Sequence, residues 1–112
     1  MILYGIPNCD TIKKARKWLT DQGVPYEFYD YKKLGVDDSL LREWIAKVGW
    51  EVLLNRRGTT WRKLSPEQRE NIDEESAIKF MLSSPSLIKR PVLIKDNLIL
   101  VGFDENKYMD LV

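Results

Sequence analysis

The sequence predicts an α/β fold with a mixed β-sheet, and three observations support this prediction. An apolar run at residues 2–4, an amphipathic helical pattern and an alternating stretch follow one another in the order of a βαβ unit. The middle of the chain, at about residues 36–84, has helical patterns. Two apolar, β-rich runs on either side of Asp96 and Asn97 then predict a hairpin that can extend the same sheet.

The βαβ unit has visible boundaries. Turn-forming residues 5–8 end the first strand, and Cys9 lies at the end of that loop. Residues 10–22 place their apolar positions on one helical face. Residues 24–31 alternate and predict a second strand, and the βαβ unit is expected to be parallel with a right-handed connection. Three residues are candidate N-caps of the helix: Asn8, Asp10 and Thr11.

Later helices are predicted from their first residues. Asp37 or Asp38 can cap one helix, and Asp73 another. Ser65 begins a Ser-Pro-Glu-Gln stretch, which is typical of a capping box with proline in the first turn. Asp104 can cap a short final helix. Three tryptophans in or beside these helical patterns are predicted to lie in the core: Trp18, Trp44 and Trp50.

Two features of the composition exclude several kinds of chemistry. The chain has 112 residues, the size of a single domain, with no histidine and one cysteine. Without histidine there is no Ser-His-Asp triad, no Cys-His dyad and no histidine-bearing zinc site. With one cysteine there is no intrachain disulfide, no C-x-x-C pair and no all-cysteine cluster, so we expect no metal site.

Charge and hydropathy limit the kinds of partner and the cellular location that we expect. Lysine and arginine total 18 and acidic residues 17, so the net charge of +1 provides no global attraction to nucleic acid or to an anionic membrane. The N-terminus lacks a signal-peptide pattern, and no apolar run approaches the ~20 residues of a membrane span. We therefore expect a monomer in the reducing cytoplasm, with neither nucleic acid nor a membrane as partner.

Cys9 is the residue in the chain best suited to nucleophilic chemistry. It is predicted to lie where a loop enters a helix, where backbone N–H groups and nearby Lys13 favour a thiolate. Asp10 opposes this effect as an adjacent negative charge. A buried, inert thiol is the alternative interpretation, and position alone leaves both open.

The stretch of residues 55–63 carries four positive charges and no acid. A solvated basic loop is the simplest interpretation. An oxyanion or carboxylate site is the more specific one, because the guanidinium groups of Arg56 and Arg57 can bind such groups in a bidentate way. Trp61 leaves single-stranded nucleic acid as a further but weakly supported possibility.

Three segments together resemble the arsenate reductase (ArsC)/Spx family, and specifically its YffB-type branch. They are Tyr-Gly-Ile-Pro-Asn-Cys-Asp-Thr at residues 4–11, Asn-Arg-Arg-Gly-Thr-Thr-Trp-Arg-Lys-Leu at 55–64 and Ile-Lys-Arg-Pro at 88–91. The resemblance covers essentially the whole chain. It implies a thioredoxin-like fold in one domain, residues 1–112, with a helical insertion between the βαβ and ββα halves. It also implies that Pro91 is cis and faces the cysteine loop.

The resemblance further implies which residues act. In arsenate reductases of the family, the cysteine at the position of Cys9 attacks the oxyanion and arginines hold it. The arginine before the cis-proline corresponds to Arg90. A second arginine corresponds in strict register to Asn55, with Arg56 and Arg57 directly after it.

This sequence departs from the arsenate-reducing pattern at two positions. The third family arginine falls near Gly102, and the histidine before the cysteine is replaced by Gly5. The leading hypothesis is therefore a thiol-disulfide oxidoreductase, a glutathione-dependent thiol reductase, in which Cys9 attacks a disulfide or another oxidised substrate. Glutathione resolves the mixed disulfide as a co-substrate, because the chain has no second thiol, and no tightly bound cofactor is expected.

Two alternatives remain. One is an arsenate reductase coupled to glutathione and glutaredoxin. The other is a regulatory or protein-binding module like Spx, although the C-x-x-C often found in Spx proteins is here Cys-Asp-Thr-Ile. Glutaredoxin or a protein disulfide is a further expected partner. The predicted catalytic residues are Cys9 and Arg90, and the predicted residues for binding substrate or glutathione are Asn8, Asp10, Thr11, Lys13, Arg56, Arg57, Arg90 and Pro91.

Overall fold

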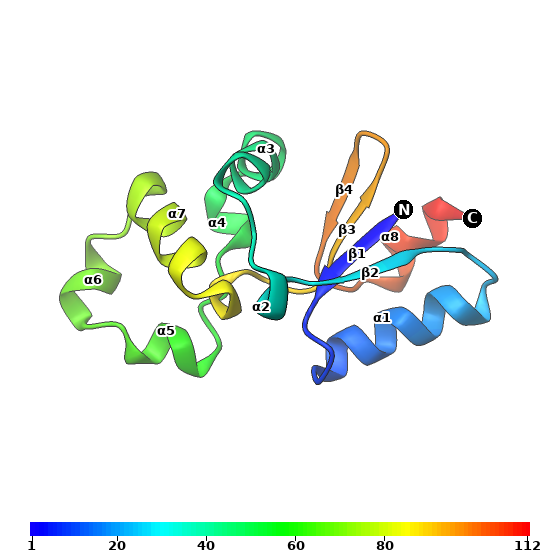
Figure 1. Ribbon diagram of the computed structural model, residues 1–112, viewed down its shortest axis with the longest axis horizontal. Helices are drawn as coiled ribbons and strands as arrows, with labels where there is room; N and C mark the ends of the chain where they lie inside the picture. The colour runs from blue at the N-terminus through cyan, green and yellow to red at the C-terminus, as the bar shows by residue number, and fades with distance from the viewer. The chain divides into compact units, whose positions relative to one another are not determined.

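The computed structural model describes all 112 residues and confirms an α/β fold with a mixed sheet (Figure 1). Two compact units can be distinguished. The first contains Met1–Leu34 and Arg90–Val112, and the second contains Gly35–Lys89. The boundaries lie near the expected insertion limits of 36 and 84. That both units form one domain stays a prediction.

The first unit is built on a four-stranded sheet with the order β2-β1-β3-β4. Its strands are β1 (Ile2–Gly5), β2 (Glu27–Asp30), β3 (Val92–Lys95) and β4 (Leu98–Val101). β1 pairs in parallel with β2 and antiparallel with β3, which in turn pairs antiparallel with β4. Tyr4 of β1 thus lies between Tyr29 and Val92. The parallel pair followed by a hairpin is the topology predicted from the sequence.

Two helical segments of the first unit pack against the sheet. α1 (Asp10–Asp21) buries Ala15 and Leu19, and α8 (Glu105–Tyr108) runs into a 3-10 turn at Met109–Leu111 (Figure 1). One core cluster joins them to β1 and β3; its buried members are Leu3, Ala15, Leu19, Leu93, Tyr108 and Leu111. Fully burying a leucine contributes about 1.5–3 kcal/mol, so this cluster fixes α1 on the sheet.

The second unit is entirely helical apart from one isolated bridge between Leu54 and Ile88. Ser65 and Asp73 begin two of its helices with complete capping boxes, as the sequence predicts for Ser65. The Asp73 carboxylate accepts a hydrogen bond from the Ser76 N–H at 2.8 Å. The helices are α3 (Asp38–Val48), α4 (Trp50–Leu53), α5 (Thr59–Lys63), α6 (Pro66–Glu70) and α7 (Glu74–Ser83), followed by a 3-10 turn at Pro85–Leu87.

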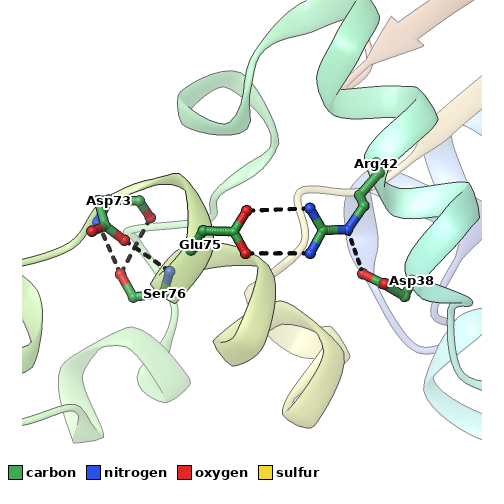
Figure 2. Close-up of polar contacts among 5 residues, drawn as sticks. All are labelled: Asp38, Arg42, Asp73, Glu75 and Ser76. Atoms are coloured by element: carbon green, nitrogen blue, oxygen red, sulfur yellow. Dashed lines mark hydrogen bonds and ion pairs between the residues drawn. The ribbon is translucent and has the colours of Figure 1, made fainter.

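An ion-pair network links α3 to α7 on the surface of the second unit (Figure 2). The Arg42 guanidinium donates to both carboxylate oxygens of Glu75, at 3.2 and 3.3 Å, and its Nε donates to Asp38 at 2.9 Å. All three side chains are largely exposed to solvent. Exposed pairs contribute only about 0–1 kcal/mol to stability, so this network adds little to the packing of the two helices.

Four predictions about local structure are wrong in detail. The second strand is shorter than residues 24–31, because the Val24 N–H still bonds to Leu19 at the end of α1 and the chain leaves β2 at Asp30. The N-cap of α1 is Cys9 itself rather than Asn8, Asp10 or Thr11.

The basic stretch 55–63 is not all loop, because Thr59–Lys63 forms α5. Of the three tryptophans predicted to lie in the core, Trp44 is buried but Trp18 and Trp50 are only half-buried. No helix has both the length and the apolar character needed to cross a membrane.

Candidate active site

Three chain segments meet at one end of the sheet in the first unit. β1 and β2 are parallel, so the loop after Gly5 and the turn after Asp30 both leave the sheet at the C-terminal ends of these strands. β3 is antiparallel to β1, so it begins at the end of the sheet where β1 finishes. Arg90, two residues before Val92, therefore lies at this same end, next to β1 on the side opposite β2. In this register Tyr31 and Arg90 flank the loop that carries Cys9.

Cys9 occupies the junction between that loop and α1. Its backbone is extended, with φ −115° and ψ 130°, and its carbonyl accepts the first helical hydrogen bond from Lys13 at 2.9 Å. The thiol is half-buried and free. Its sulfur makes no regular capping hydrogen bond, but the N–H groups of Ile12 and Thr11 point toward it as weak N–H···S contacts.

The Arg90 side chain completes the surroundings of the sulfur. Partial burial by itself raises the pKa of the Cys9 thiol. The backbone N–H of Ile12, the hydrogen bond and positive charge of Arg90 and the N–H of Thr11 together outweigh burial, and the pKa lies below its ordinary value. A thiolate at the N-terminus of a helix beside a guanidinium is the form that attacks disulfides and other electrophiles.

Arg90 is itself held in place by its chain position and by its neighbours. The peptide bond between Arg90 and Pro91 is cis. Pro91 is buried, and its carbonyl accepts a hydrogen bond from the Gly102 N–H at 2.8 Å, which joins the start of β3 to the end of β4. The Arg90 side chain is half-buried and contacts both Cys9 and Tyr31.

Tyr31 is a site residue that the sequence analysis missed. The alternation of residues 24–31 predicts that it ends the second strand, but in the structure it is the first residue of the short helix α2 (Tyr31–Leu34). Its side chain is completely buried. Burial raises the pKa of its hydroxyl far above the ordinary value, so the group stays neutral. Topology could have identified Tyr31, because a residue directly after a strand parallel to β1 lies at the same end of the sheet as Cys9.

The remaining predicted residues of the first unit take different positions. Thr11 contributes its backbone N–H to the sulfur, while its side chain is exposed. The side chains of Asn8, Asp10 and Lys13 are exposed around the loop and the first turn of α1. Their role in binding glutathione stays a prediction.

Arg56 and Arg57 belong to the second unit, and each is exposed. The guanidinium carbon of Arg56 lies 6.0 Å from the ring centroid of Trp50 and 5.5 Å from that of Trp61, so two cation–π contacts hold it. The Arg57 N–H donates to the Asn55 side chain at 3.1 Å. That either arginine serves the Cys9 site stays a prediction.

Comparison with known proteins identifies the family. The model of the ArsC family matches residues 4–111. A protein of Haemophilus influenzae named only as uncharacterised is 42% identical over 95% of this chain and 93% of its own. The global transcriptional regulator Spx of Listeria innocua is 26% identical over 94% of this chain and 81% of its own.

Solved structures agree with the sequence comparison. A YFFB protein superimposes with a TM-score of 0.92 at 51% identity, covering 97% of this chain and 96% of that one. An ArsC-related protein of Brucella melitensis has a TM-score of 0.81 at 51% identity, covering 97% and 91%. Arsenate reductase from Vibrio cholerae has a TM-score of 0.84 over 99% of this chain and 96% of that one, but at 15% identity it shows the fold alone. These matches span nearly the whole chain, which therefore belongs to the ArsC family.

Proposed function

We propose that this protein is a glutathione-dependent thiol reductase whose nucleophile is Cys9. The single observation that carries the proposal is the contact between Arg90 and the Cys9 sulfur, together with the lowered pKa of that thiol. The chain offers no histidine to act as a base, so the thiolate depends on backbone N–H groups and on Arg90. Membership of the ArsC family supports the same reaction class.

The reaction balances with glutathione as the source of electrons. The Cys9 thiolate attacks the glutathione sulfur of a mixed disulfide, forms a new S–S bond to it and releases the substrate thiolate, which takes up a proton from water. The thiolate of a second glutathione then attacks the glutathione sulfur on Cys9. Oxidised glutathione leaves and the Cys9 thiolate is restored. One substrate disulfide is reduced and two glutathione sulfurs are joined, so a single protein thiol is sufficient.

Two measurements test the proposal together. The first is reduction of a glutathionylated peptide by glutathione, followed through NADPH consumption by glutathione reductase. We expect turnover by the wild type and none by Cys9→Ser. The second is the rate of alkylation by iodoacetamide against pH, in which Arg90→Ala moves the midpoint to higher pH.

Arg16→Ala is the matched control for the loss of a guanidinium, because Arg16 is occupied by the Tyr26 hydroxyl at 3.0 Å and by the Phe28 ring at 4.3 Å. It should leave both measurements unchanged. A wild-type alkylation midpoint at or above that of free cysteine, or equal turnover by Cys9→Ser, would refute the proposal.

A second candidate activity is reduction of arsenate with glutathione and glutaredoxin. The pairing of a thiolate with a guanidinium favours it, because the same pair suits an oxyanion. Against it, Gly5 replaces the histidine of arsenate-reducing relatives and Gly102 replaces an arginine. The test is arsenate-dependent oxidation of glutathione in the presence of glutaredoxin, with loss of the activity in Arg90→Ala. Absence of turnover over a wide range of arsenate concentrations eliminates this candidate.

A third candidate is a regulatory module, favoured by the similarity to Spx. In that case Cys9 is dispensable for binding a protein partner. Pull-down with wild type and with Cys9→Ser distinguishes the two situations. Equal recovery of a specific partner together with absence of thiol turnover supports the regulatory role and contradicts the reductase.

A further inference from the structure

The hydroxyl of Tyr31 is a second anchor for Arg90 within the first unit. The Arg90 guanidinium is in hydrogen-bonding contact with the Cys9 sulfur and also with the Tyr31 side chain. Guanidinium is a planar donor with several N–H groups and no acceptor, so it can serve both partners at once. Arg90 thus joins Tyr31, after β2, to Cys9, after β1.

The position of Tyr31 is fixed by its own segment. The Asp30 carboxylate accepts hydrogen bonds from the backbone N–H groups of Lys32 and Lys33, both at 3.1 Å. These two bonds begin α2 directly after β2. Because the Tyr31 side chain is completely buried, its ring has little freedom and its hydroxyl is presented to Arg90 from a fixed place.

The chemistry of a neutral hydroxyl suits this role. A carboxylate in the same place would hold Arg90 more strongly, but its negative charge would oppose the thiolate. Burial keeps the Tyr31 hydroxyl neutral, so it can accept a hydrogen bond from Arg90 and leave the positive charge available to the sulfur. Three titratable or charged groups act on the Tyr31 hydroxyl: Arg90 before β3, Cys9 at the start of α1 and Asp30 at the end of β2. Arg90 is also the charged group that acts on the Cys9 sulfur.

We propose that Tyr31 is a positioning residue that holds the Arg90 guanidinium against the Cys9 sulfur. The proposal rests on the proposed function, in which Cys9 acts as a thiolate. It assigns Tyr31 a role only through Arg90 and not through any contact with substrate.

The test is a double-mutant cycle read out by the pH dependence of Cys9 alkylation. Tyr31→Phe keeps the buried ring and removes only the hydroxyl. We expect its alkylation rate at pH 6 to fall about three- to tenfold, as for the loss of one hydrogen bond, while the rate at high pH stays near that of the wild type. Added to Arg90→Ala, the same change should have no further effect, because nothing remains to be positioned.

Tyr108→Phe is the matched control. Tyr108 is also completely buried, but its hydroxyl has no hydrogen-bond partner. Its loss should leave the alkylation profile unchanged. A general effect of removing a buried tyrosine hydroxyl would instead appear in both variants and would overturn the proposal.

The remaining outcomes separate this proposal from the proposed function. If Arg90→Ala shifts the profile and Tyr31→Phe does not, the role of Tyr31 is overturned while the thiolate mechanism stands. If Tyr31→Phe shifts the profile equally with and without Arg90, the effect does not pass through Arg90 and the proposal also fails. If Arg90→Ala itself has no effect, the proposed stabilisation of the thiolate fails first.

A measurement on the wild type keeps the proposal testable if Tyr31→Phe does not fold. The Nε–H signal of Arg90 in ¹⁵N NMR should show a rigid, protected side chain, because two partners hold the guanidinium. A highly mobile Arg90 side chain with rapid exchange would overturn the positioning role.

Discussion

The side chain of Ile12 fills the space beside the Cα of Gly5. A Cβ added to Gly5 would overlap the terminal methyl group of Ile12 and would also touch Phe28. Gly5 is the last residue of β1 and Ile12 lies in the first turn of α1, so the two meet where strand and helix converge before Cys9. The family histidine that corresponds to Gly5 has no room here while Ile12 keeps its place. This packing explains why the smallest residue stands at the end of β1: any larger side chain at position 5 requires Ile12 to move.

Gly5→Ala should therefore destabilise the first unit. Forcing an extra carbon into a packed interior costs about 1–3 kcal/mol. We expect the urea midpoint to fall by a corresponding amount. Gly5→Ala combined with Ile12→Val should lose less than the sum of the two single changes, because valine lacks the overlapping methyl. Strict additivity would show that the two side chains do not compete for the same space.

Tyr108→Phe should raise the stability of the protein. The Tyr108 hydroxyl is buried without a hydrogen-bond partner, while its ring packs edge-on against Trp18 and Phe103. Removing an unsatisfied buried hydroxyl removes a desolvation penalty of about 1–3 kcal/mol. Phenylalanine keeps both ring contacts, so the free energy of unfolding in urea should increase. A clear decrease would reveal a partner for the hydroxyl, such as a buried water.

Asp73 should make stability depend on pH at acid values. The Ser76 backbone N–H and hydroxyl hold the pKa of the Asp73 carboxyl below its ordinary value. Because the folded pKa is lower than the unfolded pKa, the stabilisation is complete above the unfolded pKa, about 3.9. It is lost as the pH falls through the lower, folded pKa.

Asp73→Asn is the variant that isolates this charge. Asparagine caps helices about as well as aspartate but does not titrate. The melting temperature of the wild type should exceed that of Asp73→Asn at pH 6, and the difference should vanish toward pH 2. A difference that is constant over this range would mean that the Asp73 charge contributes nothing.

Much of the fold could be predicted because its signals are local. The capping box at Ser65, the hairpin turn at Asp96 and the helical face of residues 10–22 are each encoded within a few neighbouring residues. The position of Cys9 at a helix N-terminus follows from the same kind of signal. The sequence could not show that Cys9 itself would be the N-cap, because several neighbours have better capping side chains.

The surroundings of Tyr31 could not be predicted from local pattern. Alternation over residues 24–31 is typical of a strand, but hydrogen bonds decide where a strand ends, and the Asp30 carboxylate ends this one. Contact between Tyr31 and Arg90 joins residues far apart in the sequence and depends on the strand order β2-β1-β3. The contacts of Arg56 with the rings of Trp50 and Trp61 likewise depend on where the chain places α4 and α5.

Arg90→Lys should fall between the wild type and Arg90→Ala. Lysine keeps the positive charge, but a flexible ammonium lacks the planar fork with which the guanidinium serves the Cys9 sulfur and the Tyr31 hydroxyl together. We expect Arg90→Ala to lower kcat/KM for a glutathionylated peptide roughly 10- to 100-fold, as for the loss of a charge-assisted hydrogen bond, and Arg90→Lys to lower it less. The alkylation midpoint should follow the same order. Arg90→Ala removes the positive charge beside the sulfur, whereas Arg90→Lys keeps the charge and changes only the hydrogen-bonding geometry. If Arg90→Lys is as active as the wild type, charge alone is sufficient and the two-partner geometry of Arg90 has no part in the reaction.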